Sequence, residues 1–166
     1  MGFGEGLDDR PVNAQRETKS ISNETTFDRD IDDKAELTRV LVAHCERVAA
    51  RLRNGGLSAG GVTLKLRLPD FSLRTRSRVG LRATQLTPRL FAAEQALLDA
   101  RPGGTAYRLP GLAATDLSPS ADADDLIDSY GRREKLREAA IASLRDKFGA
   151  AAVQRGLAFR PSSRKP

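Results

Sequence analysis

The residues with the clearest chemistry in this sequence are cations that alternate along two short segments. Lys65 and Arg67 alternate with leucines in VTLKLRL (62–68), and Arg74, Arg76 and Arg78 occupy every second position of LRTRSRV (73–79). Rows of ammonium and guanidinium groups bind anions, above all phosphate oxygens. Residues 34–112 carry 14 basic and 5 acidic side chains, whereas residues 1–33 carry 4 basic and 9 acidic ones. This concentration of positive charge favours a polyanionic partner, and the alternative is a merely solubilising surface.

Catalytic chemistry has little support in the sequence. The only histidine, His44, lies on the apolar stripe of a predicted helix, and its neighbour Cys45 points about 100° away from it, so the two do not form a nucleophile–base pair. Four aspartates, Asp28, Asp30, Asp32 and Asp33, precede the same helix, where carboxylates more often cap a helix than bind a metal. We therefore predict no catalytic residue, no metal site and no cofactor in this chain.

The alternating segments predict two antiparallel strands joined by a turn at PDFS (69–72). On this interpretation one face of the hairpin is buried and the other is cationic. The predicted buried face consists of Val62, Leu64, Leu66, Leu68, Leu73, Thr75, Ser77 and Val79. The predicted cationic face consists of Lys65, Arg67, Arg74, Arg76 and Arg78.

Two helices are expected to cover the buried face. The first has capping-box spacing at Asp33 and Glu36 and ends at Asn54-Gly55-Gly56. Its predicted buried stripe is Leu37, Leu41, His44, Val48 and Leu52. The second helix has Thr87 as its expected N-cap and Pro88 at its first position, and it stops at RPGG (101–104).

Two further strands complete the predicted sheet. The first, 18–27, is rich in hydroxyl groups and places Ser20 and Ser22 on one side; the last, TAYRLPGL (105–112), points Arg108 outward and should end or bend at Pro110. The element order β-α-β-β-α-β is the split βαβ motif, an α+β fold with four antiparallel strands and two helices on one face. The open face would then carry Arg108 together with the five cations of the hairpin.

The rest of the chain is expected to flank this domain. We predict a leader at 1–14, the sheet domain at 15–115, an acidic linker at 116–130, and a C-terminal helix with a basic tail at 131–166. The expected apolar stripe of the last helix is Leu136, Ala140, Ile141, Leu144 and Phe148. No apolar run is long enough to span a membrane and no signal-peptide pattern is present, so we expect a soluble cytoplasmic protein without membrane contacts.

Four blocks in order resemble one family: DDRPVNAQRETKSISNETTFDRDI, GVTLKLRLPDFSLRTRS, YRLPGL and LRDKFGAAAVQRG. From about Gly6 to Phe159 the chain resembles the C-terminal little-finger domain of Y-family translesion DNA polymerases, in the bacterial DNA polymerase IV (DinB) branch. The resemblance implies that the open sheet face lies along primer–template DNA without sequence preference. It also implies that the strand containing Ser20 and Ser22 runs beside the DNA backbone.

The resemblance also limits the expected activity. In that family, acidic residues of a palm domain hold the magnesium ions of nucleotidyl transfer, and no part of this chain resembles a palm domain. We therefore expect the chain to be inactive as a polymerase on its own. A full polymerase activity assigned to this chain would need the missing palm carboxylates.

The segment QRGLAF (154–159) resembles bacterial sliding-clamp-binding peptides through Gln154, Leu157 and Phe159, although Gly156 departs from their pattern. The alternative is that Val153, Leu157 and Phe159 pack on the last helix. Two functions therefore remain open: a DNA-binding domain, and a protein-interaction module that uses the sheet for an acidic partner or the tail for the sliding clamp.

Overall fold

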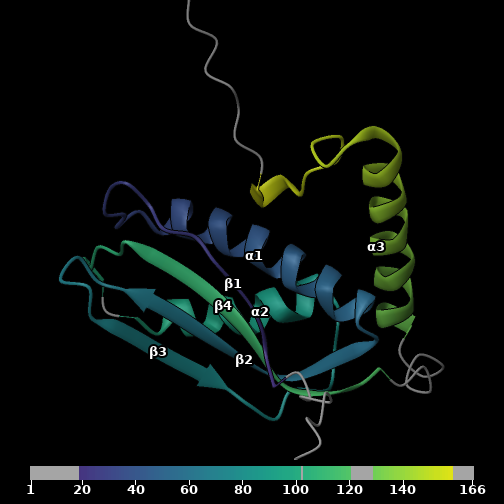
Figure 1. Cartoon of the computed structure of the whole chain (residues 1–166), viewed down its shortest axis with the longest axis horizontal. Helices are drawn as coiled ribbons and strands as arrows, with labels where there is room; N and C mark the ends of the chain where they lie inside the picture. The colour runs from purple at the N-terminus through teal and green to yellow at the C-terminus, as the bar shows by residue number, and fades with distance from the viewer. Residues whose placement is uncertain (1–18, 102, 121–128, 159–166) are drawn as a thin grey trace, which may run out of the picture.

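The computed structural model describes residues 19–101, 103–120 and 129–158. In this part of the chain, four antiparallel strands form one sheet in the order β1-β4-β2-β3, and two helices cover one of its faces (Figure 1). The elements are β1 (Ile21–Glu24), α1 (Lys34–Asn54), β2 (Leu57–Arg67), β3 (Leu73–Arg78), α2 (Thr87–Asp99) and β4 (Leu109–Pro119). This arrangement confirms the predicted α+β fold. None of the described helices is long and apolar enough to cross a membrane.

Helix α1 begins and ends where the sequence predicts. The Asp33 carboxylate accepts a hydrogen bond from the Ala35 backbone N–H at 2.9 Å, and Gly55 follows the last residue. Glu36 does not complete a capping box, because it forms an ion pair with Arg29 at 2.7 Å. The predicted stripe Leu37, Leu41, His44, Val48 and Leu52 is buried. It packs on the sheet residues Val62, Leu64 and Leu66, which face the helices.

The start of helix α2 differs from the prediction. Thr87 is not the N-cap: the cap residue is Leu86, which has no capping side chain. The Thr87 N–H instead donates to Glu138 at 2.8 Å, and Glu138 lies in a distant helix. A carboxylate from another element therefore stabilises the positive end of α2.

Strand β4 is longer than predicted and runs through Pro110. Pro110 lies opposite Leu66 in a central strand, and its carbonyl accepts a hydrogen bond from the Thr25 N–H at 3.1 Å. Proline lacks only the donor, so the strand continues with a single missing bond. Residues 113–119, which we assigned to the end of the domain and a linker, pair with the first half of β2. The predicted leader at 1–14 and residues 121–128 of the predicted linker lie outside the described residues.

Helix α3 (Ser129–Phe148) stands across the end of the sheet near the C-terminus of α1 (Figure 1). Its expected apolar stripe does not form the docking face. Leu136 is 69% exposed, and Leu144 and Phe148 are exposed too, whereas Glu134 and Glu138 are buried. The helix therefore docks through charged side chains.

A network of ion pairs between α1, α3 and the tail explains this docking. Glu138 forms ion pairs with Arg53 of α1 and with Arg155 of the tail, and Glu46 of α1 pairs with Arg145 and Arg155, each at 3.0 Å. Arg155 thus bridges two carboxylates from two helices. The short helix η2 (Gly156–Ala158) follows it and packs on α1.

Candidate nucleic-acid interface

The register between β2 and β3 decides which side of the sheet each cation occupies. Arg74 pairs with Leu66, Arg76 with Leu64 and Arg78 with Val62. Residues directly opposite in an antiparallel pair project to the same face. The three arginines therefore project to the helix-covered side, and the prediction that they share a face with Lys65 and Arg67 was wrong.

The opposite face confirms this register. Thr75 pairs with Lys65 and Ser77 with Thr63, and the Thr63 and Ser77 hydroxyl oxygens lie 2.8 Å apart. Thr75 and Ser77, which we expected in the core, are exposed on the open face. The open face of the hairpin thus carries hydroxyl groups beside the cations of β2.

The cause of the error is a hairpin loop one residue shorter than expected. Leu68 pairs with Ser72, because the Leu68 N–H donates to the Ser72 carbonyl at 2.9 Å, so only three residues form the loop. Phe71 completes the turn in the left-handed region, at φ 65°. A shift of one residue in register exchanges every side chain between the two faces.

The three arginines are exposed even though they project to the helix side. Strand β3 is the edge strand, and all six of its residues are exposed, so the helices leave its side chains accessible. Within the described residues, Arg76 and Arg78 form no side-chain hydrogen bond or ion pair. Two bonds from Ser72 lower the pKa of the Asp70 carboxyl, and the nearby charge of Arg74 adds to this effect.

The outer edge of β3 also presents backbone donors. Hydrogen-bonded and non-hydrogen-bonded pairs alternate along an antiparallel ladder, and the Leu68–Ser72 pair is hydrogen-bonded. It follows that Thr75 and Ser77 belong to non-hydrogen-bonded pairs and that their N–H groups point away from β2. Among the described residues, the edge therefore alternates guanidinium groups with N–H groups that have no backbone partner, and both kinds of group can bind phosphate.

The open face is less cationic than predicted. Lys65 forms an ion pair with Glu24 of β1 at 2.8 Å, reaching across β4 at Gly111. A Cβ at Gly111 would lie 2.6 Å from Cγ of Glu24, so the missing side chain makes room for this pair. Arg67 faces the same side, and its Nε is buried without a hydrogen-bond partner among the described residues.

Of the remaining residues predicted to contact DNA, Ser20 and Ser22 lie at β1, and Arg108 directly precedes β4. Ser22 lies on the open face opposite Ala113, whereas Ser20 is exposed just before β1 begins. Arg108 is already occupied: it forms an ion pair with Asp30 at 2.9 Å, and its guanidinium carbon lies 5.4 Å from the centre of the Phe71 ring.

Sequence reasoning missed Phe71, which it treated as part of a polar turn. Its side chain is 62% exposed at the tip of the cationic hairpin. A phenylalanine between Asp70 and Ser72, where no hydrophobic periodicity requires one, was the available signal.

The predicted tail residues are only partly described. Gln154 is exposed, and Leu157 is 57% exposed. Val153 is half-buried, and its carbonyl accepts a bond from Arg145 at 2.8 Å. Phe159 lies outside the described residues.

The titratable groups of the interior serve packing. His44 bonds the Thr25 hydroxyl at 2.9 Å, and burial, reinforced by Arg47, lowers its pKa to about 4. Cys45 donates to Glu94 at 3.0 Å; burial raises the pKa of Cys45, and burial raises that of Glu94 to about 8. In the described ranges, no group of three or more His, Cys, Asp or Glu residues is placed to hold a metal ion.

A split βαβ sheet with a row of exposed arginines on its edge strand defines the class of α+β domain to which this chain belongs. The C-terminal domain of the impB/mucB/samB family matches residues 18–126, and the chain belongs to this family. DNA polymerase IV 1 of Mesorhizobium japonicum (strain LMG 29417 / CECT 9101 / MAFF 303099) is 44% identical over 156 residues, which cover 93% of this chain and 36% of that protein. The resemblance to the C-terminal part of bacterial DNA polymerase IV is thereby confirmed. The chain spans about a third of the length of the curated relatives it matches.

Two solved structures are also similar. A complex of the beta-clamp processivity factor with the little finger domain of PolIV is 28% identical and covers 62% of this chain and 93% of that chain, with a TM-score of 0.45. A post-insertion binary complex of Dbh DNA polymerase is 9% identical and covers 58% of this chain and 28% of that chain, with a TM-score of 0.50. The second similarity shows a shared fold.

Proposed function

We propose that this domain grips the sugar–phosphate backbone of duplex DNA, as the little-finger part of a translesion polymerase of the DNA polymerase IV type. The observation that carries the proposal is the edge strand β3, where Arg74, Arg76 and Arg78 are exposed and the last two have no carboxylate partner among the described residues. The relatives are named as DNA polymerases, which supports DNA as the polyanion that this domain binds.

The geometry of β3 suits a phosphate backbone. Alternate residues of a strand are about 7 Å apart, so three guanidinium groups cover a row of about 14 Å. The free N–H groups of Thr75 and Ser77 lie between them, and Arg67 adds a fourth cation from β2. Contacts to phosphate carry no sequence information, so binding should be independent of sequence.

The proposed contact surface differs from the one expected from the sequence. It is the rim of the sheet rather than the whole open face, because Lys65 and Arg108 are neutralised by Glu24 and Asp30. Arg67 extends it onto the open face, whereas Ser22 lies on that face at the opposite edge of the sheet, on β1.

Salt dependence tests the proposal. If about four phosphates are neutralised, log K should fall with log salt with a slope near −3.6, from about −0.9 per phosphate. Fluorescence anisotropy with unrelated duplexes measures this slope. Changing Arg74, Arg76 and Arg78 to glutamate should abolish binding and leave unfolding cooperative, because none of the three is buried.

A matched triple variant controls for net charge. Arg47, Arg133 and Lys147 are exposed on α1 and α3, and changing them to glutamate reverses the same amount of charge away from β3. This variant should retain most of the affinity. Equal losses in the two variants, or an affinity that does not change with salt, would refute binding at the rim.

The proposed role does not include nucleotidyl transfer. The relatives are named as polymerases, but the cations and amides of β3 can bind phosphate without supplying a metal site. We propose that the catalytic carboxylates and their magnesium belong to the palm domain of the polymerase and that the protein acts on cytoplasmic DNA. Purified chain should extend no primer with magnesium or manganese.

The tail supports a second candidate function, a protein-binding peptide. Arg155 is anchored to Glu46 and Glu138, so the backbone beside it is held in place while Gln154 and Leu157 face solvent. A sliding clamp is the proposed partner. Leu157→Ala should abolish binding to purified clamp without changing the melting temperature; a lower melting temperature with clamp binding intact would indicate packing instead.

A further inference from the structure

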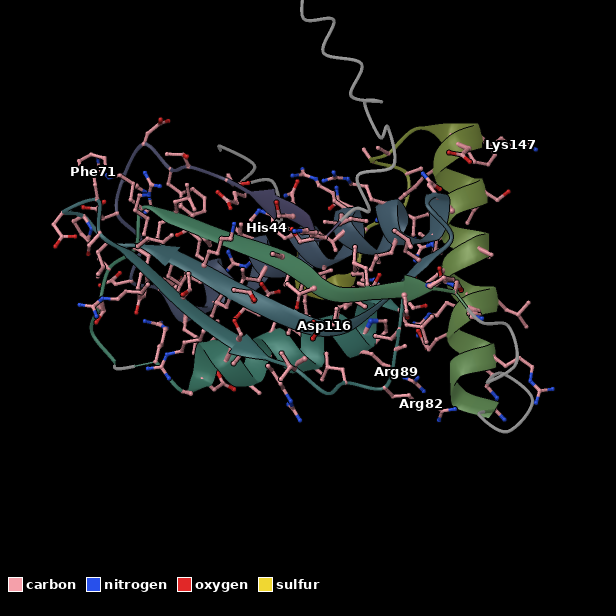
Figure 2. The ribbon with its side chains drawn as sticks, turned by 60° about the horizontal axis from the view of Figure 1, so that its bottom comes forward. His44, Phe71, Arg82, Arg89, Asp116 and Lys147 are labelled. Atoms are coloured by element: carbon pink, nitrogen blue, oxygen red, sulfur yellow. The ribbon has the colours of Figure 1, made fainter. Side chains whose placement is uncertain are left out.

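Phe71 combines exposure with an unfavourable backbone conformation. Its φ is 65°, a region that glycine and asparagine prefer, and its side chain is 62% exposed. Phe71 marks the end of the sheet far from Lys147 and helix α3 (Figure 2). A bulky residue in this conformation costs stability, of order 1 kcal/mol or more, so the ring needs an explanation beyond the turn.

The ring is held from one side by a fixed cation. The Arg108 guanidinium carbon lies 5.4 Å from the ring centre, within the range of a cation–π interaction. Arg108 is itself fixed, because its side chain pairs with Asp30 at 2.9 Å and its backbone N–H donates to the Arg67 backbone carbonyl at 2.8 Å. Three segments thus support the ring, although it belongs to neither of the apolar clusters of the core.

We propose that Phe71, backed by Arg108, is a stacking platform for an unpaired nucleobase. The inference rests on the proposed DNA binding and adds a second kind of contact to it. Stacking on aromatic rings is how proteins bind unpaired bases, and it tolerates any sequence because every base has a π-face. The arginines of β3 follow Phe71 along the chain, so a backbone held on that strand brings nearby bases to the tip.

The charges around the ring favour a base over a phosphate. The neighbouring Asp70 carboxylate is exposed and stays ionised, because bonds from Ser72 lower its pKa. A phosphate would be repelled by that carboxylate, whereas a neutral base would not. Leu73, two residues further along the chain, is also half exposed.

The test uses the intact chain and two duplexes that differ by one unpaired 2-aminopurine. The chain contains no tryptophan, so the fluorescence of 2-aminopurine can be excited with little protein background. Wild type should bind the duplex with the unpaired base about tenfold more tightly than the paired duplex and should quench its fluorescence. Phe71→Gly should lose both effects, bind the paired duplex as wild type does, and melt at the same or a higher temperature. Phe71→Tyr should retain both effects.

The outcomes separate this inference from the proposed function. Wild type that binds both duplexes equally, without quenching, overturns the stacking platform and leaves backbone binding intact. Wild type that binds only the duplex with the unpaired base supports the platform and overturns backbone binding at the rim; binding to neither overturns both. If Phe71→Gly melts lower and Phe71→Leu restores both stability and discrimination, the side chain serves packing and the platform is wrong.

Discussion

Replacing Glu94 by glutamine should remove a loss of stability that the wild-type protein undergoes as the pH rises from 4.5 to about 8. Glu94 lies on α2 with no exposed surface, and its only hydrogen-bond partner among the described residues is the Cys45 thiol. Burial raises its pKa to about 8, from 4.5 for an exposed glutamate. The folded protein therefore keeps this carboxyl protonated at neutral pH, whereas the unfolded chain ionises it.

The sign and size of the effect follow from proton linkage. Between pH 4.5 and about 8 the folded state binds one more proton at Glu94 than the unfolded state does, so stability falls as pH rises. Each pH unit changes the free energy of unfolding by about 1.4 kcal/mol. We compare the free energy of unfolding of Glu94→Gln with that of wild type at each pH. From pH 4.5 to pH 7 this difference should change by about 3 kcal/mol in favour of the variant.

Urea unfolding of both proteins from pH 4.5 to 8 measures this difference. His44 acts in the opposite direction, because its lowered pKa makes stability fall as pH drops from 6.5 to about 4. Subtracting the two curves removes that contribution, which both proteins share. A difference that stays constant with pH would refute the assignment of a protonated Glu94.

Two further substitutions test features of the sheet and of helix α3. Gly111→Ala should lower the melting temperature, because its Cβ would lie 2.6 Å from Cγ of Glu24 and displace the Glu24–Lys65 pair. In the double variant, Glu24→Ala should relieve most of this loss. If the effects of the two substitutions on the melting temperature are additive, the steric explanation is wrong. Glu138→Gln should cost about 3 kcal/mol, because it leaves Arg53 without its buried partner, and hydrogen exchange at the Thr87 amide should accelerate. If Thr87 remains protected in that variant, Glu138 does not stabilise the start of α2.

The hairpin shows how far sequence reasoning can reach. Alternation within each segment predicted both strands and correctly identified the faces of β2. It could not relate one strand to the other, because their relative faces depend on the loop length. Three-residue loops normally carry glycine or asparagine at the left-handed position, and Phe71 concealed that signal.

Helix α3 and strand β4 show the same limit at longer range. An amphipathic pattern predicts which residues share a stripe, but the docking of α3 is decided by Arg53 and Arg155, which lie elsewhere in the sequence. Pro110 signals the end of a strand in isolation. Here its carbonyl side faces β1, so the strand loses one donor and continues.

The exposed edge of β3 has a consequence for the behaviour of the protein at high concentration. An edge with free N–H and carbonyl groups is a template on which a second chain can add a strand and begin to aggregate. The like charges of Arg74, Arg76 and Arg78 keep two such edges apart. Neutralising them with glutamine should therefore promote dimers or larger assemblies at low salt, whereas glutamate keeps the edges mutually repulsive. The arginines proposed to attract DNA would then also prevent aggregation through the edge of β3.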